Sequence, residues 1–363
     1  MSDRDRIARL RLARSDSIGA ITYSRLIQRF GTAEAALAAL PDLAARAGGK
    51  PLRIASKADA ERELAAVTKS GGQLLFRGLA PYPRLLDEAD GTPPVLIVQG
   101  RLALFERPAV ALVGARNASA AAVRFARKLG LELAEAGILV ISGLARGIDA
   151  AAHQGALDHA TAAVVAGGID IFYPPENEAL QRAIAERGLL VSEMPLGVEP
   201  RARHFPRRNR IIAGLALGTV VIEAAPRSGS LITARLAADY GREVMAVPGS
   251  PLDPRAQGCN QLIRGGATLI QSAEDVIESL PPMDIAPLAP PSGRAASPDP
   301  TAVDDGERAS IVALLGPVAV PVDELVRQSG HPPAVIQTVL LELDLAGQLE
   351  HHAGGRISLN TSA

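Results

Sequence analysis

Aromatic residues and cysteine are scarce in this sequence. Phe, Tyr and Trp make up 3% of the 363 residues, tryptophan is absent, and Cys259 is the single cysteine. So few aromatic rings argue against an extended stacking platform for nucleic acid. One cysteine excludes a disulfide framework and any multi-cysteine metal or iron–sulfur site. We interpret Cys259 as a small buried residue.

Long apolar segments are also missing. The first sixteen residues, MSDRDRIARLRLARSD, are charged where a secretory signal would be apolar. No apolar run is long enough to span a bilayer. Hydrophobic residues at 47% and charged residues at 21% are typical of a globular chain. We therefore expect a soluble cytoplasmic protein without a membrane partner, and the length predicts two or three domains.

Several cofactor and nucleotide motifs are absent. The chain has four lysines, at positions 50, 57, 69 and 128, and no G-x-x-x-x-G-K-[ST], which excludes a P-loop NTPase. The glycines of GLARG (143–147) do not form G-x-G-x-x-G, and no acidic residue stands where a ribose would bind. SGSLITA (228–234) is not a G-x-S-x-G nucleophile elbow. We expect no cofactor, no metal and no catalytic residue.

Six short apolar runs alternate with helical stretches in the middle of the chain. Strands that are apolar on both faces and alternate with helices predict a doubly wound, mostly parallel α/β sheet. Right-handed crossovers would place the carboxyl ends of these strands at one edge, where ligands bind. The runs cover residues 109–116, 138–147, 161–168, 188–193, 218–225 and 243–249.

The two ends of the chain predict small helical domains. Residues 1–70 have apolar residues at helical spacing and suggest a SAM-like or helix–hairpin–helix module, or a small bundle that only packs. Seven prolines within 281–300 indicate a linker over 281–304. Residues 305–363 predict three helices and a β-wing, a winged helix. The main domain would span 71–280.

The charge distribution favours the middle domain as an anion site. Residues 1–70 carry a net charge of +5 and residues 304–363 a net charge of −5, each counted from Lys, Arg, Asp and Glu. Glu342 and Asp344 in the third helix of the winged helix would repel phosphates, so we expect a protein-contact or regulatory role for this domain. The segment RARHFPRRNR (201–210) holds five arginines, and no acid occurs between Glu199 and Glu223. Arginine suits bidentate phosphate contacts, and Phe205 suits one stacked base.

Glycine and hydroxyl residues follow three of the predicted strands. VGARNAS (113–119), SGLARG (142–147) and RSGS (227–230) each precede a helical stretch, where backbone N–H groups can approach an anion. The same glycines can also serve only to make tight turns. Asp149 and His153 lie one helical turn apart and are either a general base pair or, as we favour, a cap that orients a core histidine. Glu193 and Glu223 either bond the arginine loop or mark an unrecognised catalytic site, and we read His351 and His352 as solvated surface.

Ten ordered motifs resemble one family, the DNA-processing protein A family, also called DprA or Smf. They span about residues 75–280, and the two end domains resemble the accessory domains of that family. The motifs are YPRLL (82–86), PPVLIVQG (93–100), VGARNAS (113–119), SGLARGIDAAAHQGAL (142–157), GGIDIFYPPEN (167–177), VSEMPLG (191–197), FPRRNRIIAGL (205–215), EAAPRSGSLITA (223–234), VPGSP (247–251) and GCNQLIRGGA (258–267).

The resemblance implies an extended Rossmann-like domain that binds single-stranded DNA without cleaving it. It also implies that the chain protects incoming strands, helps to load the recombinase RecA in natural transformation, and acts as a homodimer. The site that it implies comprises Gly114, Arg116, Ser142, Gly143, Arg146, Phe205, Arg207, Arg208, Asn209, Arg210, Ser228, Gly229 and Thr233.

The competing function is that of an enzyme. The same Rossmann variant is similar to that of nucleotide phosphoribohydrolases, whose P-G-G-x-G-T-x-x-E loop supplies a catalytic glutamate. The corresponding segment here is PRSGSLITA (226–234), which has no acid after Thr233.

Overall fold

The computed structural model describes residues 1–46, 52–281, 303–352 and 355–360. The chain divides into two compact units, one of Met1–Arg62 with Pro287–Ala363 and the other of Glu63–Ala286. The predicted linker (281–304) lies almost entirely outside the described residues, and the predicted domain boundaries stay a proposal. None of the helices in the described part of the chain is long and apolar enough to cross a membrane.

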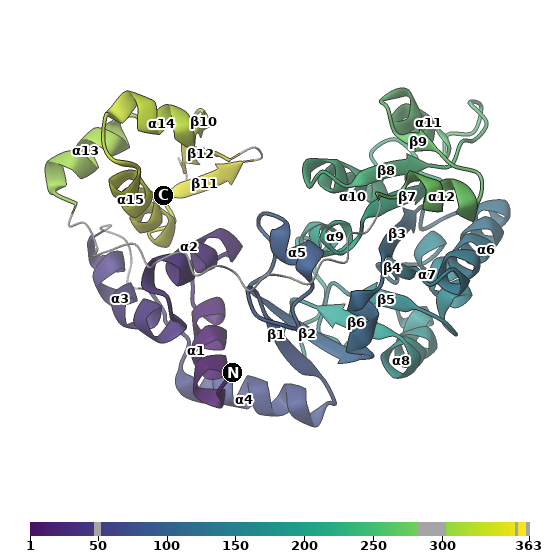
Figure 1. The fold of residues 1–363 in the computed structure, drawn as a ribbon, viewed down its shortest axis with the longest axis horizontal. Coiled ribbons are helices and arrows are strands. Elements are labelled where there is room, and N and C mark those ends of the chain that lie inside the picture. Colours follow the sequence, from purple (N-terminus) through teal and green to yellow (C-terminus); the bar gives the residue numbers. More distant parts are fainter. Residues whose placement is uncertain (47–51, 282–302, 353–354, 361–363) are drawn as a thin grey trace. The chain divides into compact units, whose positions relative to one another are not determined.

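A nine-stranded sheet forms the centre of the second unit, in the order β1-β2-β6-β5-β4-β3-β7-β8-β9 (Figure 1). Strands β3 to β9 run parallel to one another, whereas β2 is antiparallel to β6 and β1 is antiparallel to β2. The strands are β1 (Gln73–Phe76), β2 (Val95–Gly100), β3 (Ala109–Gly114), β4 (Leu139–Ser142), β5 (Thr161–Val164), β6 (Leu189–Ser192), β7 (Gly218–Ile222), β8 (Glu243–Ala246) and β9 (Thr268–Leu269).

The direction of winding reverses beside β3. From β3 the chain adds β4, β5 and β6 on one side and then crosses back to place β7 on the other side of β3. Val113 pairs with Val221 and Gly114 with Ile222, so the carboxyl ends of β3 and β7 adjoin. Such a switch point is where doubly wound folds bind ligands. The predicted doubly wound, mostly parallel sheet is confirmed.

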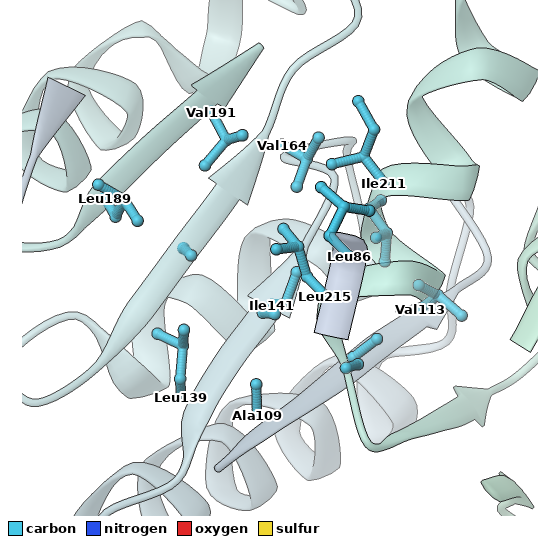
Figure 2. Packing of buried hydrophobic residues seen from close by; sticks show 14 of the residues in the cluster. Leu86, Ala109, Val113, Leu139, Ile141, Val164, Leu189, Val191, Ile211 and Leu215 are labelled. Carbon is cyan, nitrogen blue, oxygen red and sulfur yellow. The ribbon is translucent and has the colours of Figure 1, made fainter. Parts of the chain in front are cut away.

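Alternate strand residues are buried on opposite faces of the sheet. Ala111, Val113 and Ile141 pack against Ile211 and Leu215 of α9 on one face (Figure 2). Helices on both faces exclude water from the strands, and therefore the strands are apolar throughout. The helices of this unit, with α4 at its boundary, are α4 (Lys57–Lys69), α5 (Arg84–Glu88), α6 (Ala120–Glu135), α7 (Ile148–Ala156), α8 (Glu178–Arg187), α9 (His204–Leu215), α10 (Gly229–Asp239), α11 (Gln257–Arg264) and α12 (Ala273–Ser279), with two 3₁₀ turns, η1 (Leu102–Glu106) and η2 (Pro175–Asn177).

The first unit joins the helical N-terminal module to the winged helix, and both predicted modules are confirmed. The module comprises α1 (Asp3–Arg14), α2 (Ala20–Phe30) and α3 (Ala33–Arg46). The winged helix comprises α13 (Asp305–Ala313), α14 (Val322–Ser329), α15 (Pro333–Leu345) and the three strands β10 (Val320–Pro321), β11 (Leu349–His352) and β12 (Arg356–Leu359). The expected wing turn at Gly354 and Gly355 falls partly on residues 353–354, outside the described residues.

Helix α15, which a winged helix would place in a DNA groove, packs inside this unit. Leu341 and Leu345 belong to the same buried cluster as the N-terminal helices. The hydroxyl of Thr22 donates to a carboxylate oxygen of Asp344 at 2.5 Å, and Arg308 pairs with the buried Glu342 at 3.0 Å. The two acids that we expected to repel DNA are therefore engaged within the unit.

We expected His351 and His352 to be solvated surface residues, but both have side-chain partners. His351 Nε2 lies 3.2 Å from Oδ1 of Asp344, and His352 Nε2 lies 2.8 Å from the Ser358 hydroxyl. Both side chains are half-buried because β11 pairs with β12 in the small sheet and faces α15.

Candidate nucleic-acid interface

Two glycine-rich loops meet at the switch point. A Cβ on Gly114 would lie 2.0 Å from the carbonyl oxygen of Ile222, so only glycine lets β3 end this close to β7. Gly147 has a φ of +77°, and a Cβ there would lie 2.3 Å from the carbonyl oxygen of Ala115. The loops that follow β3 and β4 are therefore held against each other. Arg116 projects from the first of them and is exposed.

Asp149 fixes the second loop. Its buried carboxylate accepts hydrogen bonds from the backbone N–H groups of Gly143 at 3.2 Å and Ala145 at 3.4 Å. Burial raises the pKa of Asp149, opposed by the Arg208 guanidinium 3.8 Å away and by these two N–H groups. Asp149 secures the loop leading to Arg146, as expected, but it is not a helix cap, because α7 has Gly147 at its N-cap and no side-chain cap hydrogen bond.

His153 is not bonded to Asp149, contrary to that interpretation. Its Nδ1 lies 2.7 Å from the hydroxyl of Thr161, and that hydroxyl donates to the carbonyl of Val140 at 3.1 Å. The Thr161 oxygen is thus left to accept from Nδ1–H. Complete burial lowers the pKa of His153 to about 3. His153 is a neutral core residue and not a base facing the cleft.

Helix α9 brings the aromatic ring of Phe205 close to two guanidiniums. The Arg116 guanidinium carbon lies 5.1 Å from the centre of that ring, and the Arg208 carbon lies 5.9 Å from it. Both distances are within the range of cation–π attraction. Tyr173, which we did not predict, adds a second ring 5.8 Å from Phe205 and tilted by 57°. The motif YPPEN contains this tyrosine and was a signal that could have identified it.

Two adjoining hollows surround these residues, and together we call them the Phe205 cleft. The inner hollow has a volume of about 30 Å³ and is lined by Arg146, Tyr173 and Gly143 among others. The outer hollow has a volume of about 680 Å³ and reaches to Ser228, Gly229 and the N-terminus of α10. Arg116, Phe205 and Arg208 line both. The outer hollow is of a size that holds small organic groups, ~300–1,000 Å³.

Most of the predicted site residues meet in this cleft. Asn209 donates to the carbonyl of Gly229 at 3.3 Å and so ties α9 to the start of α10. Arg227 and Arg255, which we did not single out, also line the outer hollow. The predicted residues in the cleft are Gly114, Arg116, Gly143, Arg146, Phe205, Arg208, Asn209, Ser228, Gly229 and Thr233.

Three predicted residues lie elsewhere. Ser142 is completely buried, and its hydroxyl donates to the carbonyl of Leu112 at 2.6 Å. Arg210 turns to Glu193, with Nη2 2.5 Å from the carboxylate oxygen, and lines neither hollow. Arg207 lines a separate hollow together with Arg201 and Arg203. The five-arginine segment is therefore divided among three environments.

The remaining singled-out residues have structural roles. The Glu223 carboxylate accepts the backbone N–H of Ser119 at 2.7 Å, close to the start of α6, while Glu193 bonds the arginine segment through Arg210. Cys259 is completely buried, as expected, and burial raises the pKa of its thiol to about 11. In the described ranges, no group of three His, Cys, Asp or Glu side chains could hold a metal ion.

The fold and the cleft define a doubly wound α/β protein with an arginine-lined cleft at its switch point. A family model described as DNA recombination-mediator protein A matches residues 73–281. Two further models, a DprA-like N-terminal HHH domain and a DprA winged helix domain, match residues 3–66 and 295–355. The chain belongs to the DNA recombination-mediator protein A family, DprA/Smf, as its motifs suggested.

Individual relatives agree with this assignment. Protein Smf of Escherichia coli is 40% identical over 284 residues, which cover 77% of this chain and 75% of that protein. DNA processing protein DprA of Streptococcus pneumoniae is 45% identical over 198 residues, covering 54% and 70% of the two chains. The X-ray structure of the pneumococcal protein superposes with a TM-score of 0.59 and 40% identity, over 63% of this chain and 79% of that one.

A second solved structure is described as showing the single-stranded DNA binding mode of DNA processing protein A from Helicobacter pylori. It superposes with a TM-score of 0.53 at 29% identity, over 57% of this chain and 94% of that one.

Proposed function

We propose that this chain binds single-stranded DNA in the Phe205 cleft and acts in DNA processing. The observation that carries the proposal is the placement of the guanidiniums of Arg116 and Arg208 within 6 Å of the Phe205 ring. An aromatic face stacks on any base, and guanidiniums bond phosphate oxygens, so this combination suits an unpaired polynucleotide without sequence preference.

The two hollows differ in size, so each would hold a different part of the strand. The inner hollow, at about 30 Å³, has room for no more than a small group such as a phosphate oxygen or a water. The outer hollow, at about 680 Å³, accommodates a base and its sugar beside Phe205. At the N-terminus of α10 the Ser228 hydroxyl accepts the N–H of Ser230, and the exposed Gly229, where a Cβ would meet nothing within 4 Å, offers its backbone N–H to a second phosphate.

The wider role that we propose is that of a recombination mediator. Family membership supports DNA processing, and the proposal is that the chain protects incoming single strands in the cytoplasm and helps to load RecA in natural transformation. We propose that it acts as a homodimer and binds the strand without cleaving it. The family description and the cleft chemistry support this role.

A titration of labelled oligothymidylate and of a matched duplex, each at two salt concentrations, tests the proposal. Because phosphate contacts release counterions, the affinity for the single strand should fall with salt, with a slope of about 0.7 for each phosphate held. The duplex should bind more weakly, because paired bases cannot reach Phe205. Equal affinity for the duplex, or an affinity that does not change with salt, would refute the proposal.

The enzyme alternative has its own test. Incubation with nucleoside monophosphates should release no free base. Asp149 is the one carboxylate among the described lining residues of the two hollows, and it is occupied by two backbone N–H groups. Release of free base would favour a nucleotide phosphoribohydrolase instead.

A further inference from the structure

A second basic hollow lies beside the Phe205 cleft, and the proposed function above does not use it. It has a volume of about 690 Å³ and is lined by residues of the 194–199 loop and by Arg201, Arg203, His204 and Arg207. The three arginines are exposed, and no carboxylate of the described residues lies within ion-pairing distance of them. We call this site the Arg203 hollow.

The geometry of α9 separates the two sites while keeping them adjacent. Phe205 and Arg208 face the cleft, whereas Arg203 and Arg207, four residues apart and so on one helical face, line the Arg203 hollow. The imidazole of His204 contacts residues of both sites. Its Nδ1 accepts the backbone N–H of Arg201 at 3.3 Å, and the ring also bonds the backbone of Ala166 in the wall of the inner hollow.

The positive charge in this hollow exceeds the negative charge of its lining residues. Among the eight residues that line it, Glu199 carries the only carboxylate, against three guanidiniums. Burial lowers the pKa of His204, and the positive charges of Arg203, Arg207 and Arg201 lower it further. His204 is therefore neutral and does not add to the repulsion. Three exposed like charges held together with one acid favour a polyanion as the occupant.

We propose that the Arg203 hollow binds the phosphate backbone of the same single strand as it leaves the Phe205 cleft. This rests on the proposed function and extends it. The hollow offers guanidiniums but no aromatic ring among its lining residues, so it holds phosphates and not bases. One strand can pass from one site to the other around the N-terminus of α9, because Pro200 and Ala202 line the cleft on the same segment that supplies Arg201 and Arg203.

The double variant Arg203→Ala/Arg207→Ala tests this proposal on the full-length chain with two probes. A thymidine dinucleotide fills only the Phe205 cleft, and a long oligothymidylate reaches both sites. We expect the dinucleotide to bind the variant as it binds the wild type. The long oligothymidylate should bind about tenfold or more weakly at low salt. The slope of log affinity against log salt should decrease by about 1.4, since each phosphate that no longer meets an arginine accounts for about 0.7.

The matched control is Arg124→Ala/Arg264→Ala. It removes the same charge from two exposed arginines on α6 and α11 that line none of these hollows. If the double variant matches this control on the long probe, the proposal is overturned. It is also overturned if the dinucleotide loses as much affinity as the long probe, because the two arginines would then belong to the cleft itself.

Different experimental results would refute the proposed function and the proposal of a second site. A wild-type chain that binds neither probe refutes the proposed function, and the further site falls with it. A wild-type chain that binds both probes, loses affinity on Arg116→Ala and is unaffected by Arg203→Ala/Arg207→Ala keeps the function and loses only the second site. Thermal unfolding of each variant verifies that the exposed substitutions leave the fold intact.

Discussion

The guanidinium of Arg208 lies directly over Gly143. A Cβ built on Gly143 would be 1.6 Å from Nη1 of Arg208 and 2.2 Å from its Cζ. Since Arg208 is 7% exposed and 3.8 Å from the buried Asp149, its head has little room to move aside. The glycine that follows β4 thus sets the position of the arginine beside Phe205.

Gly143→Ala should therefore displace Arg208. We expect weaker single-stranded DNA binding and a loss of about 1–3 kcal/mol of folding free energy from overpacking. Fluorescence anisotropy and denaturant unfolding measure the two effects. Gly316→Ala, where a Cβ would meet nothing within 4 Å, is the control and should change neither quantity appreciably. Full affinity in Gly143→Ala would mean that the position of Arg208 is irrelevant to binding.

Arg210→Ala should affect stability more than DNA affinity. Arg210 and Glu193 are 19% and 16% exposed, so removing the arginine takes a close ion-pair partner from a partly buried carboxylate. We expect a loss of about 1–3 kcal/mol in the free energy of unfolding and an affinity within about twofold of wild type. A large loss of affinity without destabilisation would place Arg210 on the DNA after all.

His153 should make the stability depend on pH. Its pKa is about 3 in the folded chain and about 6.5 in an exposed histidine. The unfolded chain therefore takes up a proton between these values while the folded chain does not, and stability falls as the pH decreases from about 6.5 towards 3. The expected slope is roughly 1.4 kcal/mol for each pH unit.

Urea unfolding of wild type and His153→Asn across this pH range isolates the contribution of the histidine. The asparagine amide can replace Nδ1–H as the donor to Thr161. The difference between the two stability curves should shrink as the pH falls, because the effects of the carboxylates are common to both. Parallel curves would show that His153 does not resist protonation in the folded chain.

Leu341→Ala should test the packing of α15 within the first unit. Leu341 is 2% exposed in the cluster that it shares with the N-terminal helices. The substitution should cost about 2–5 kcal/mol in the stability of that unit, and DNA affinity should stay unchanged. Calorimetric unfolding and anisotropy measure these separately. A matching loss of DNA affinity would show that the first unit contributes to the interface.

The alternation of apolar runs with helical stretches was sufficient to predict the doubly wound sheet, because a strand covered on both faces must be apolar throughout. The edge strands β1 and β9, and β2 next to β1, were not predicted. Helix α15 was predicted as a helix, but its burial against α2 and α3 depends on residues about three hundred positions away.

The site was predicted only in part, because local sequence identifies its loops but not the distant residues that its side chains contact. Glycines and hydroxyls at strand ends identified the loops, since local geometry requires them there. The division of 201–210 could not be predicted, because the partner of Arg210 is Glu193 in another segment and Arg208 is aligned by Asp149 across the sheet edge. His153 bonds Thr161 instead of Asp149 for a similar reason, as its partner lies on β5 and not on its own helix.

The salt dependence of single-stranded DNA binding by Arg116→Ala tests the central claim most directly. Arg116 is exposed, has no carboxylate among the described residues within ion-pairing distance, and stands 5.1 Å from the Phe205 ring, so its removal should not disturb the fold. We expect the affinity for oligothymidylate to fall by about tenfold or more and the salt slope to decrease by about 0.7. Unchanged affinity and an unchanged slope would contradict the assignment of the Phe205 cleft as the DNA site.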